Sequence, residues 1–280
     1  MKLSIITINK NNAKGLRKTM ESVLSQTYRD FEYIVVDGAS SDDSVNIIKE
    51  FAQKFETKDR KLENFKWISK PDTGIYNAMN KGVKMSHGEY SLMLNSGDCL
   101  AEDDVIERVL PELRGDDVIQ GGMYMQTKDV EHLDYGFGGT KMSFFDVCDG
   151  DFLHQATFVR KDVYERYGYY DESYLITGDT AFFVRVLGFY NVSFRVIEIP
   201  ISIFEGGGVA SSKNTQLAEL RHKEFLRVEH EIIGERLTRV YREDYKKIQL
   251  YDRLHSHRLM WYCTMAIVRF CNLFQNSTKR

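Results

Sequence analysis

Short apolar runs alternate with helix-type patterns through the first hundred residues of this 280-residue chain. The β-branched and aromatic runs predict four strands, over Leu3–Ile8, Phe31–Val36, Phe65–Ile68 and Tyr90–Leu94. Apolar residues at helical spacing predict three helices between and beside them, over 15–24, 45–51 and 75–85. Strands and helices in this order imply right-handed crossovers and a mainly parallel sheet. The predicted fold class is therefore α/β, with the sheet flanked by helices.

Polar side chains follow the predicted strands. Asn9, Asp37, Asp72 and the segment Asn95–Asp98 all come at or just after a strand end. Parallel sheets bind ligands beyond the carboxyl ends of their strands, so these residues mark the expected site. For Asp37, a plain Asp-Gly turn with Gly38 is an equally good interpretation from the residues alone.

Composition excludes several classes of protein. With 42% hydrophobic and 28% charged residues, the chain is neither disordered nor fibrous. Its four cysteines are far apart and form no C-x-x-C pair, so a disulfide framework or a cysteine zinc site is not expected, and a reducing compartment fits. The N-terminal apolar run is too short for a secretory signal and no run reaches about 18 apolar residues, which favours a cytoplasmic protein.

Two common phosphate-binding motifs are missing from the chain. The first predicted strand is followed by Asn9-Lys10-Asn11-Asn12 rather than by G-x-G-x-x-G, and no G-x-x-x-x-G-K-[ST] occurs. Dinucleotide redox chemistry and P-loop phosphoryl transfer therefore lack their usual phosphate cradle. A nucleotide can still bind through a carboxylate at the end of the second strand, where Asp37 stands.

Seven segments, in their order along the chain, make a specific match to a known family. They are Ser4–Asn9, Ser22–Tyr28, Phe31–Ser40, Lys70–Gly82, Gly88–Tyr90, Leu94–Asp98 and His154–Ala156. Together they resemble family 2 glycosyltransferases, in the bacterial branch that builds capsular, colanic-acid-like and O-antigen polysaccharides. The resemblance covers residues 3 to about 208 and implies a GT-A fold, in which a Rossmann-like nucleotide-binding half is joined to an acceptor-binding half. We expect a GT-A domain over 1–212, with halves of about 1–100 and 101–212, and a helical C-terminal extension over 213–280.

The resemblance also implies roles on the donor side. Thr7 and Asn9 are expected near the nucleotide, Asp37 on the uracil or ribose, and Asp72 near the base or the donor sugar. The expected donor is a nucleotide diphosphate sugar, most simply a UDP-sugar.

The metal motif of the family is depleted in this chain. Asn95-Ser96-Gly97-Asp98 stands where the family carries D-x-D-D, so Asp98 is the one acid left, with Asn95 beside it on the donor side. Mn²⁺ and Mg²⁺ prefer anionic oxygen ligands, and diphosphate oxygens and waters can complete their shell. We expect a divalent ion on Asp98, bound more weakly than in relatives with more acids. The alternative is that Asp98 is only a turn or cap residue.

On the acceptor side, the resemblance points to Asp179 as the catalytic base. Ile176–Phe183 is similar to the family's helix start that carries this carboxylate. An acceptor hydroxyl must lose its proton as it attacks the anomeric carbon, which requires such a base. From the residues alone, Asp179 is equally a helix cap or first-turn acid. His154, Gln155 and Gly207 are expected to contact the acceptor or the diphosphate, with a structural histidine and a plain connector as the alternatives.

The C-terminal segment differs in charge from the rest of the chain. Residues 213–280 hold 14 Lys and Arg against 8 Asp and Glu, whereas the chain as a whole has a net charge of −3. Residues 255–275 combine aromatic, aliphatic and basic side chains, which suits a helix lying in a membrane interface. A buried docking helix or a homodimer contact explains the same pattern. The expected acceptor is a saccharide, lipid-linked to undecaprenyl, at the cytoplasmic face of the plasma membrane; no nucleic-acid partner is expected.

These observations predict an inverting, metal-assisted glycosyltransferase. Two alternatives stay open at this point. A nucleotide-sugar pyrophosphorylase shares the sheet architecture but normally needs a Gly-rich loop where Asn9–Asn12 stands. A catalytically silent nucleotide-sugar-binding or scaffold protein is favoured by the depleted metal motif.

Overall fold

The computed structural model of the chain describes residues 1–56, 62, 64–126, 131–136, 144–149, 152–190, 192–204, 206, 214–240, 242 and 247. The chain divides into two compact units, Met1–Val228 and Glu229–Arg280. The first unit carries the sheet and every predicted site residue that the structure describes.

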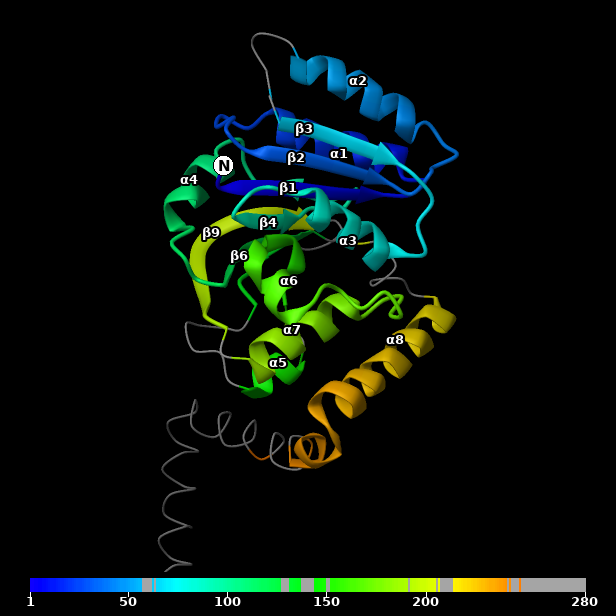
Figure 1. Cartoon of the computed structure of the whole chain (residues 1–280), viewed down its shortest axis with the longest axis vertical. Helices are drawn as coiled ribbons and strands as arrows, with labels where there is room; N and C mark the ends of the chain where they lie inside the picture. The colour runs from blue at the N-terminus through cyan, green and yellow to red at the C-terminus, as the bar shows by residue number, and fades with distance from the viewer. Residues whose placement is uncertain are drawn as a thin grey trace, which may run out of the picture. The chain divides into compact units, whose positions relative to one another are not determined.

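One mixed sheet organises the first unit (Figure 1). Among the described residues its strand order is β3-β2-β1-β4-β8-β6-β9-β5, with β7 paired to β6. The strands are β1 (Leu3–Asn9), β2 (Glu32–Asp37), β3 (Asn64–Ser69), β4 (Tyr90–Met93), β5 (Cys99–Leu100), β6 (Val118–Gln126), β7 (Glu131–Asp134), β8 (Thr157–Arg160) and β9 (Phe194–Phe204). The predicted strands of the first hundred residues are thereby confirmed, each within about two residues at its ends.

Four parallel strands, β3, β2, β1 and β4, form the first half of the sheet. β1 pairs in parallel with both β2 and β4, and β2 pairs in parallel with β3. The register sets Asn9 opposite Asp37 and Asp37 opposite Ser69. Three strands therefore end side by side on one edge of the sheet, which is the edge where the sequence predicted the site.

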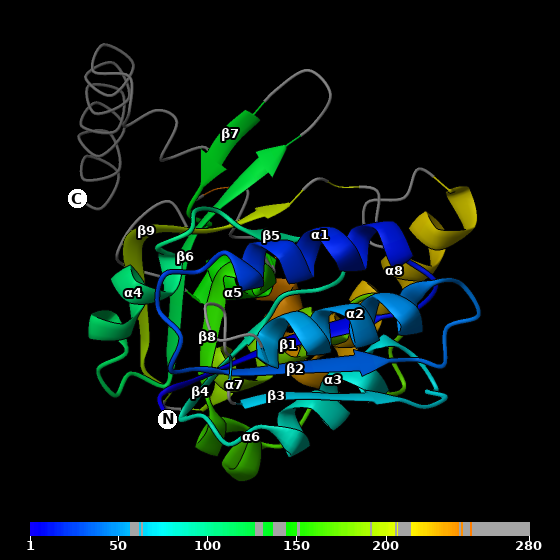
Figure 2. The same cartoon turned by 90° about the horizontal axis from the view of Figure 1, so that it is seen from above.

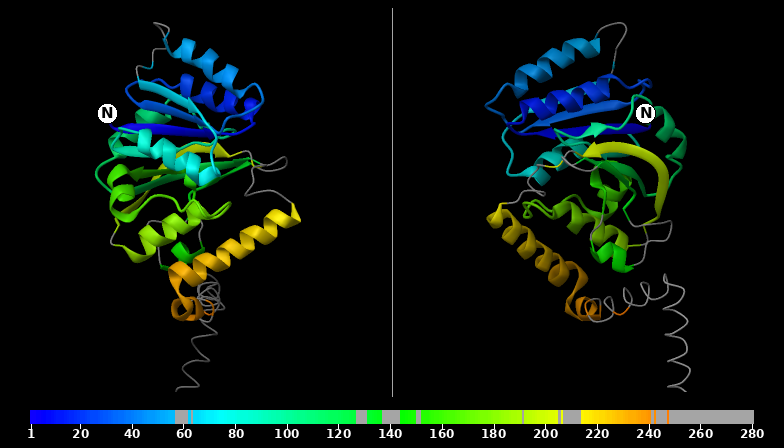
Figure 3. Two further views of the ribbon diagram at one scale, coloured as in Figure 1. Left: turned by 45° about the vertical axis from the view of Figure 1, so that its right-hand side comes forward. Right: turned by 180° about the vertical axis from the view of Figure 1, so that it is seen from behind.

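Helices cover both faces of these parallel strands. The helices are α1 (Ala13–Leu24), α2 (Ser44–Glu56), α3 (Ile75–Met85), α4 (Val105–Val109), α5 (Phe144–Asp149), α6 (Lys161–Tyr167), α7 (Gly178–Phe189) and α8 (Thr215–Val228). α1 and α2 lie side by side on one face (Figure 2), and α3 lies on the other, as the two views of Figure 3 show. Because both faces are covered, every residue of β1 and β2 is buried and their sequences are nearly continuous apolar runs.

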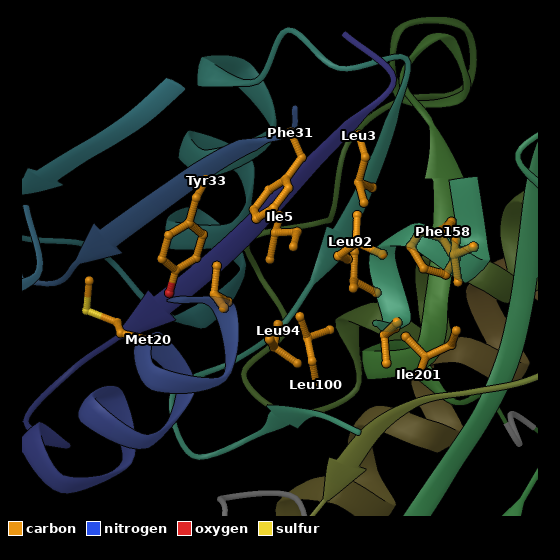
Figure 4. Packing of buried hydrophobic residues seen from close by; sticks show 14 of the residues in the cluster. Leu3, Ile5, Met20, Phe31, Tyr33, Leu92, Leu94, Leu100, Phe158 and Ile201 are labelled. Carbon is orange, nitrogen blue, oxygen red and sulfur yellow. The ribbon is translucent and has the colours of Figure 1, made fainter. Parts of the chain in front are cut away.

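The alternation of side chains along β1 divides the core into two layers. Leu3 and Ile5 point to the α1 side, where Leu16 and Met20 of α1 pack in the same apolar cluster. Figure 4 shows this cluster extending to Phe158, so it continues beneath the second half of the sheet. A single core therefore holds the two halves in one unit.

The second half of the sheet is mixed, so the expected parallel pairing holds for β3-β2-β1-β4 and for β6 with β9, with antiparallel strands between and beside them. β8 runs antiparallel between β4 and β6, while β6 and β9 pair in parallel. β6 was not anticipated from the sequence. Its Gly121 lies so close to β9 that an added Cβ would be 2.3 Å from Ile201 Cγ1. Glycine weakens a strand pattern in the sequence, and here it is required by this close approach.

After residue 215 the described residues are helical, with an irregular turn in the second unit. In the second unit, a π-helical turn spans Glu229–Ile233 and ends at Gly234, whose φ of +82° suits glycine. Residues 255–275 lie outside the described residues, as do Cys263 and Cys271, while Cys99 and Cys148 are buried free thiols. None of the described helices combines the length and the apolar character that a membrane crossing requires.

The packing of α3 on the sheet gives a test of the fold. A Cβ on Gly82 would lie 2.3 Å from Ile6 Cγ2 of β1. We expect Gly82→Val to lower the free energy of unfolding by about 1–3 kcal/mol, because the added methyl groups must push α3 away from the sheet. Urea unfolding measures the loss. Lys84→Val places the same β-branched residue on the exposed face of α3 and should change stability by less than about 0.5 kcal/mol; equal losses would contradict the packing argument.

Candidate active site

A cavity of about 690 Å³ opens at the carboxyl ends of the parallel strands. It is lined from both halves of the sheet, by strand ends, the first turns of α1 and α3, and the start of α7. The predicted site residues in its lining are Asn9, Asp72, Asn95, Asp98, His154, Gln155 and Asp179. The sequence-predicted donor and acceptor residues are thus brought to one cavity.

The turn Asn95–Asp98 is held in place by helix α1. The Thr19 hydroxyl donates to the Asp98 carbonyl at 2.7 Å and accepts from the Gly97 N–H at 2.9 Å. Asn12, the N-cap of α1, donates from Nδ2 to the Ser96 carbonyl at 2.9 Å. Two side chains of one helix therefore fix the backbone of the turn, so the position of Asp98 depends on α1 as well as on β4.

The oxygen donors of this turn fit a hard divalent cation. Asn95 Oδ1 is buried and has no hydrogen-bond partner among the described residues, and the Asp98 carboxylate lies on the same turn with the residue 6% exposed. Carboxylate and amide oxygens are ligands that Mn²⁺ and Mg²⁺ accept. Within the described residues, however, no group of three His, Cys, Asp or Glu side chains is placed to hold a metal. The protein supplies one carboxylate, so a bound ion would need diphosphate oxygens and water to complete its shell.

Three lysines also line the cavity. Lys14 and Lys18 are one turn apart on α1, and Lys10 lies in the preceding loop. Lys10 donates to the Gly38 carbonyl at 2.9 Å, and its Nζ is 3.9 Å from Asp72 Oδ1. These ammonium groups make the α1 side of the cavity positively charged, which favours an anionic ligand there.

Asp37 lies behind the cavity rather than in its lining. The residue is fully buried, and its carboxylate accepts from Asn9 Nδ2 at 2.8 Å and from the hydroxyls of Ser40 and Ser69 at 2.5 and 2.6 Å. Burial by itself would raise the pKa of Asp37, but these hydrogen bonds outweigh it and lower the pKa. Asp37 is therefore an ionised group that joins the ends of β1, β2 and β3.

Thr7 is also placed away from the cavity. It is fully buried, and its hydroxyl accepts a hydrogen bond from the Tyr33 hydroxyl at 3.1 Å. Of the residues expected near the nucleotide, the structure thus brings Asn9 and Asp72 to the cavity and leaves Thr7 and Asp37 beneath it.

Asn9 and Asp72 are positioned by the buried groups below them. Asn9 Nδ2 is engaged by Asp37, while Asn9 Oδ1 is buried with no partner in the described part of the chain. Asp72 lies directly over Gly38, where an added Cβ would be 2.1 Å from Asp72 Oδ2. Gly38 is therefore required for this close approach, beyond its place in a turn after β2.

Asp179 occupies the first turn of α7 at the opposite side of the cavity. Its Oδ1 is 3.0 Å from the Tyr76 hydroxyl, which also contacts the Ile176 carbonyl at 2.6 Å. Burial raises the pKa of Tyr76 well above its usual range, and the nearby Asp179 carboxylate raises it further. Tyr76 therefore stays protonated near neutral pH, and its neutral hydroxyl contacts the Asp179 carboxylate.

His154 is a neutral imidazole near Asp179. The residue is 5% exposed, and burial lowers its pKa, although the Asp179 charge acts in the opposite direction. Its ring packs edge-on against Tyr170, and its Nε2 has no hydrogen-bond partner among the described residues. Gln155 lines the cavity beside it, and Gly207 lies outside the described residues, although Gly206 is in the lining.

Several residues of this site were not singled out from the sequence. Tyr76 lay inside a matching segment but carried no predicted role, and Thr19 looked like an ordinary helical residue. Ser40 and Ser69 stand at strand ends beside Asp37, so the clustering of small hydroxyl residues there was the available signal. For Thr19 the sequence holds no signal, because its partners Gly97 and Asp98 are about 80 positions away.

The hydrogen bonds on Asp37 predict a pH dependence of stability. A carboxylate with a lowered folded-state pKa stabilises the protein above the unfolded pKa of about 3.9, and this contribution is lost as pH falls through the folded pKa. Asp37→Asn should therefore be less stable than the wild type by a constant amount from pH 7 to about pH 5, and the difference should shrink below about pH 4. Melting curves of both proteins across this range measure it. A difference that is unchanged at about pH 3 would mean that the pKa of Asp37 is not lowered in the folded protein.

The sequence matches a family model over most of its sheet-forming region. Residues 4–178 match the model of glycosyl transferase family 2, which spans more than half of the chain. The chain belongs to glycosyl transferase family 2. A relative from Mycobacterium bovis, named as a PGL/p-HBAD biosynthesis glycosyltransferase, is 28% identical over 217 residues, covering 75% of this chain and 79% of the relative. Membership of this family identifies the protein as a glycosyltransferase and disfavours the pyrophosphorylase and silent-scaffold alternatives.

Solved structures share the fold at low sequence identity. Staphylococcus aureus TarS 1-349 in complex with UDP-GlcNAc matches with a TM-score of 0.60 at 18% identity, covering 82% of this chain and 72% of that fragment. The mannosyltransferase PcManGT of Pyrobaculum calidifontis, in complex with GDP-Man and Mn²⁺, matches with a TM-score of 0.57 at 15% identity, covering 84% of this chain and 64% of that one, a little under two thirds of its length. These likenesses confirm the predicted GT-A fold.

Proposed function

We propose that this family 2 glycosyltransferase moves one sugar from a nucleotide diphosphate sugar, with a UDP-sugar as the expected donor, to a hydroxyl of a saccharide acceptor with inversion of configuration. The observation that carries the proposal is that Asp98, on the turn after β4, and Asp179, in the first turn of α7, line one cavity. The complexes of TarS with UDP-GlcNAc and of PcManGT with GDP-Man support a nucleotide-sugar donor.

The nucleotide would lie at the ends of β1 and β3. Asn9 Oδ1 and the Asp72 carboxylate are acceptors at this side of the cavity, suited to the N–H groups of a base and the hydroxyls of a ribose. Asp37 would act here through Asn9, whose side-chain amide it holds in one orientation. Substitution of Asp37 is therefore expected to weaken nucleotide binding both with and without a metal.

The diphosphate would lie between the Asn95–Asp98 turn and α1. Asp98 and Asn95 would hold Mn²⁺ or Mg²⁺, which neutralises charge on the leaving diphosphate when it is bound. Lys10, Lys14 and Lys18 line the same region and supply positive charge from the protein itself. Since the protein offers the ion a single carboxylate, we infer that the lysines carry part of this neutralisation.

Asp179 would be the catalytic base. The acceptor oxygen forms a bond to the anomeric carbon while its proton passes to an Asp179 carboxylate oxygen, and the bond from that carbon to the diphosphate oxygen breaks with its electron pair. The buried His154 imidazole is neutral, so it does not neutralise the carboxylate by forming an ion pair. Attack from the face opposite the leaving group inverts the configuration.

The acceptor side of the cavity combines polar and apolar groups. Gln155 offers hydrogen bonds, whereas Leu175 and Ile75 expose aliphatic side chains that are 52% and 37% accessible. A saccharide acceptor with a lipid-linked end fits this lining. The mycobacterial relative is named for PGL/p-HBAD biosynthesis, which supports a role of this chain in a biosynthetic glycosyl transfer. We extend the proposal to an undecaprenyl-linked acceptor at the cytoplasmic face of the membrane, with 255–275 as the membrane or dimer contact.

The role of Asp179 can be tested by an isosteric change. Asp179→Asn keeps the size of the side chain but cannot accept the acceptor's proton, so transfer should fall by about 10²–10⁴-fold. UDP affinity should stay near that of the wild type, because Asp179 faces the acceptor. Product formation from a panel of UDP-sugars and calorimetric titration of UDP measure the two effects, with the exposed Asp30→Asn as the matched control. A mutant that keeps more than about a tenth of the rate would exclude Asp179 as the base.

The metal role of Asp98 can be tested by binding alone. In the wild type, Mn²⁺ should raise the affinity for UDP, because a bound ion shares ligands between the protein and the diphosphate. In Asp98→Ala this increase should vanish, while binding without metal should remain through the lysines. Titration of UDP with and without Mn²⁺ measures the difference, and Asp30→Ala should behave as the wild type. If Asp98→Ala retained the full Mn²⁺-dependent increase, Asp98 would not be the metal ligand.

A further inference from the structure

A buried carboxylate on α8 holds the loop that leads into α7. Glu224 is 7% exposed, and its two carboxylate oxygens accept from three consecutive backbone N–H groups. Oε1 accepts from Leu175 at 2.7 Å, and Oε2 accepts from both Ile176 and Thr177 at 2.9 Å. The Thr177 hydroxyl adds a fourth hydrogen bond to Oε2 at 3.2 Å. Asp179 comes two residues later.

We propose that Glu224 is a positioning residue for the acceptor side of the site. By holding Leu175–Thr177, it orders this side so that Asp179 faces the cavity. The inference rests on the proposed role of Asp179 as base. It adds a residue that lies outside the matched family region, which ends at residue 178.

The start of α7 depends on this carboxylate. Thr177 is the N-cap of α7, but its side chain makes no capping hydrogen bond to the helix, and its hydroxyl donates to Glu224. N–H groups around a helix start have no partner in the helix itself and need one from elsewhere. Buried N–H groups without an acceptor are costly, so without Glu224 the loop must rearrange or admit water. Either change moves the first turn of α7.

The same loop is held from its other side by α3. The Tyr76 hydroxyl contacts the Ile176 carbonyl, so the Ile176 peptide is held through its N–H by α8 and through its carbonyl by α3. Asn80 exchanges two hydrogen bonds with the backbone of Tyr170, at 2.9 and 3.1 Å. Among the described residues, the α3 contacts leave the Leu175 and Thr177 N–H groups to Glu224, which makes Glu224 the specific support of the residues next to Asp179.

A second residue of α8 strengthens the contact. Arg227, one turn after Glu224, stacks its guanidinium over the Tyr174 ring at 4.2 Å from the centroid and lies 3.6 Å from Asp171 Oδ2. This contact holds α8 against the part of the loop that does not line the cavity. Glu224 can therefore be altered while Arg227 still holds α8 in place.

The reaction makes this position sensitive. Leu175, Ile176 and Asp179 all line the cavity, so a shift of the loop moves both the acceptor surface and the base. A misplacement of about 1 Å in a reacting group can cost about 10²-fold in rate. The donor side is built on β1, β3 and α1 and does not include this loop, so donor binding should be insensitive to Glu224.

The test compares Glu224→Ala, Glu224→Gln and the control Glu219→Ala, which removes an exposed carboxylate from the same helix. We expect kcat for transfer to fall by about 10–100-fold in Glu224→Ala and by less in Glu224→Gln, which keeps one acceptor oxygen. UDP affinity should change by less than about twofold. A tenfold change in affinity would correspond to about 1.4 kcal/mol of binding free energy. Equal losses of kcat and UDP affinity, or equal losses in Glu219→Ala, would overturn the proposal.

Two further measurements separate positioning from general damage. Hydrogen exchange of the amides of Leu175–Thr177 should speed up in both Glu224 variants while the amides of β1 stay protected; unchanged exchange in the loop would overturn the proposal. In the Asp179→Asn background, Glu224→Ala should cost little more, because Glu224 acts through Asp179. If Glu224→Ala lowered the rate in this background by as much as in the wild type, that result would also count against the proposal. If the wild type transferred no sugar, the proposed function would fail, and the exchange result would still decide whether Glu224 holds the loop.

Discussion

A single buried carboxylate ties together the strand ends on which the donor side of the site is built. Asp37 stands in register with Asn9 of β1 and Ser69 of β3, and it accepts hydrogen bonds from both side chains. Because burial alone would disfavour its charge, the donors around it must stay in place to keep it ionised. This requirement fixes the orientation of Asn9, and Asp72 lies over the adjacent Gly38. The proposed donor side of the cavity is thus held in place by hydrogen bonds of the protein itself.

The acceptor side is built in a different way. No common register joins its residues: His154 precedes the antiparallel strand β8, and Asp179 stands at the start of a helix. Their positions come from side chains that reach between elements, with Tyr76 of α3 on one side of the loop and Glu224 of α8 on the other. A site assembled in this way can vary its acceptor surface while the donor side stays constant.

Much of the nucleotide half could be predicted because its signals are local. β1, β2 and α3 are long enough, and their apolar patterns regular enough, to be placed within about two residues from sequence alone. β6 was missed because Gly121 and Gly122 weaken its pattern, and its partner β9 follows about 75 residues later. The roles of Thr19 and Glu224 were missed for the same reason: each is an ordinary helical residue until the fold sets a distant backbone segment against it.

By itself, the sequence determined the α/β class, the family and the residues at the strand ends, since periodicity and motif order are properties of neighbours along the chain. It also indicated that Asp98 is the one acid left in the metal motif. Only the tertiary structure decided that Asp37 lies beneath the cavity while Asn9 lines it, because burial depends on what packs above a side chain. It alone brought Asp98 and Asp179 to one cavity, since the contacts that place them join residues 79 and 103 positions apart and depend on three-dimensional packing.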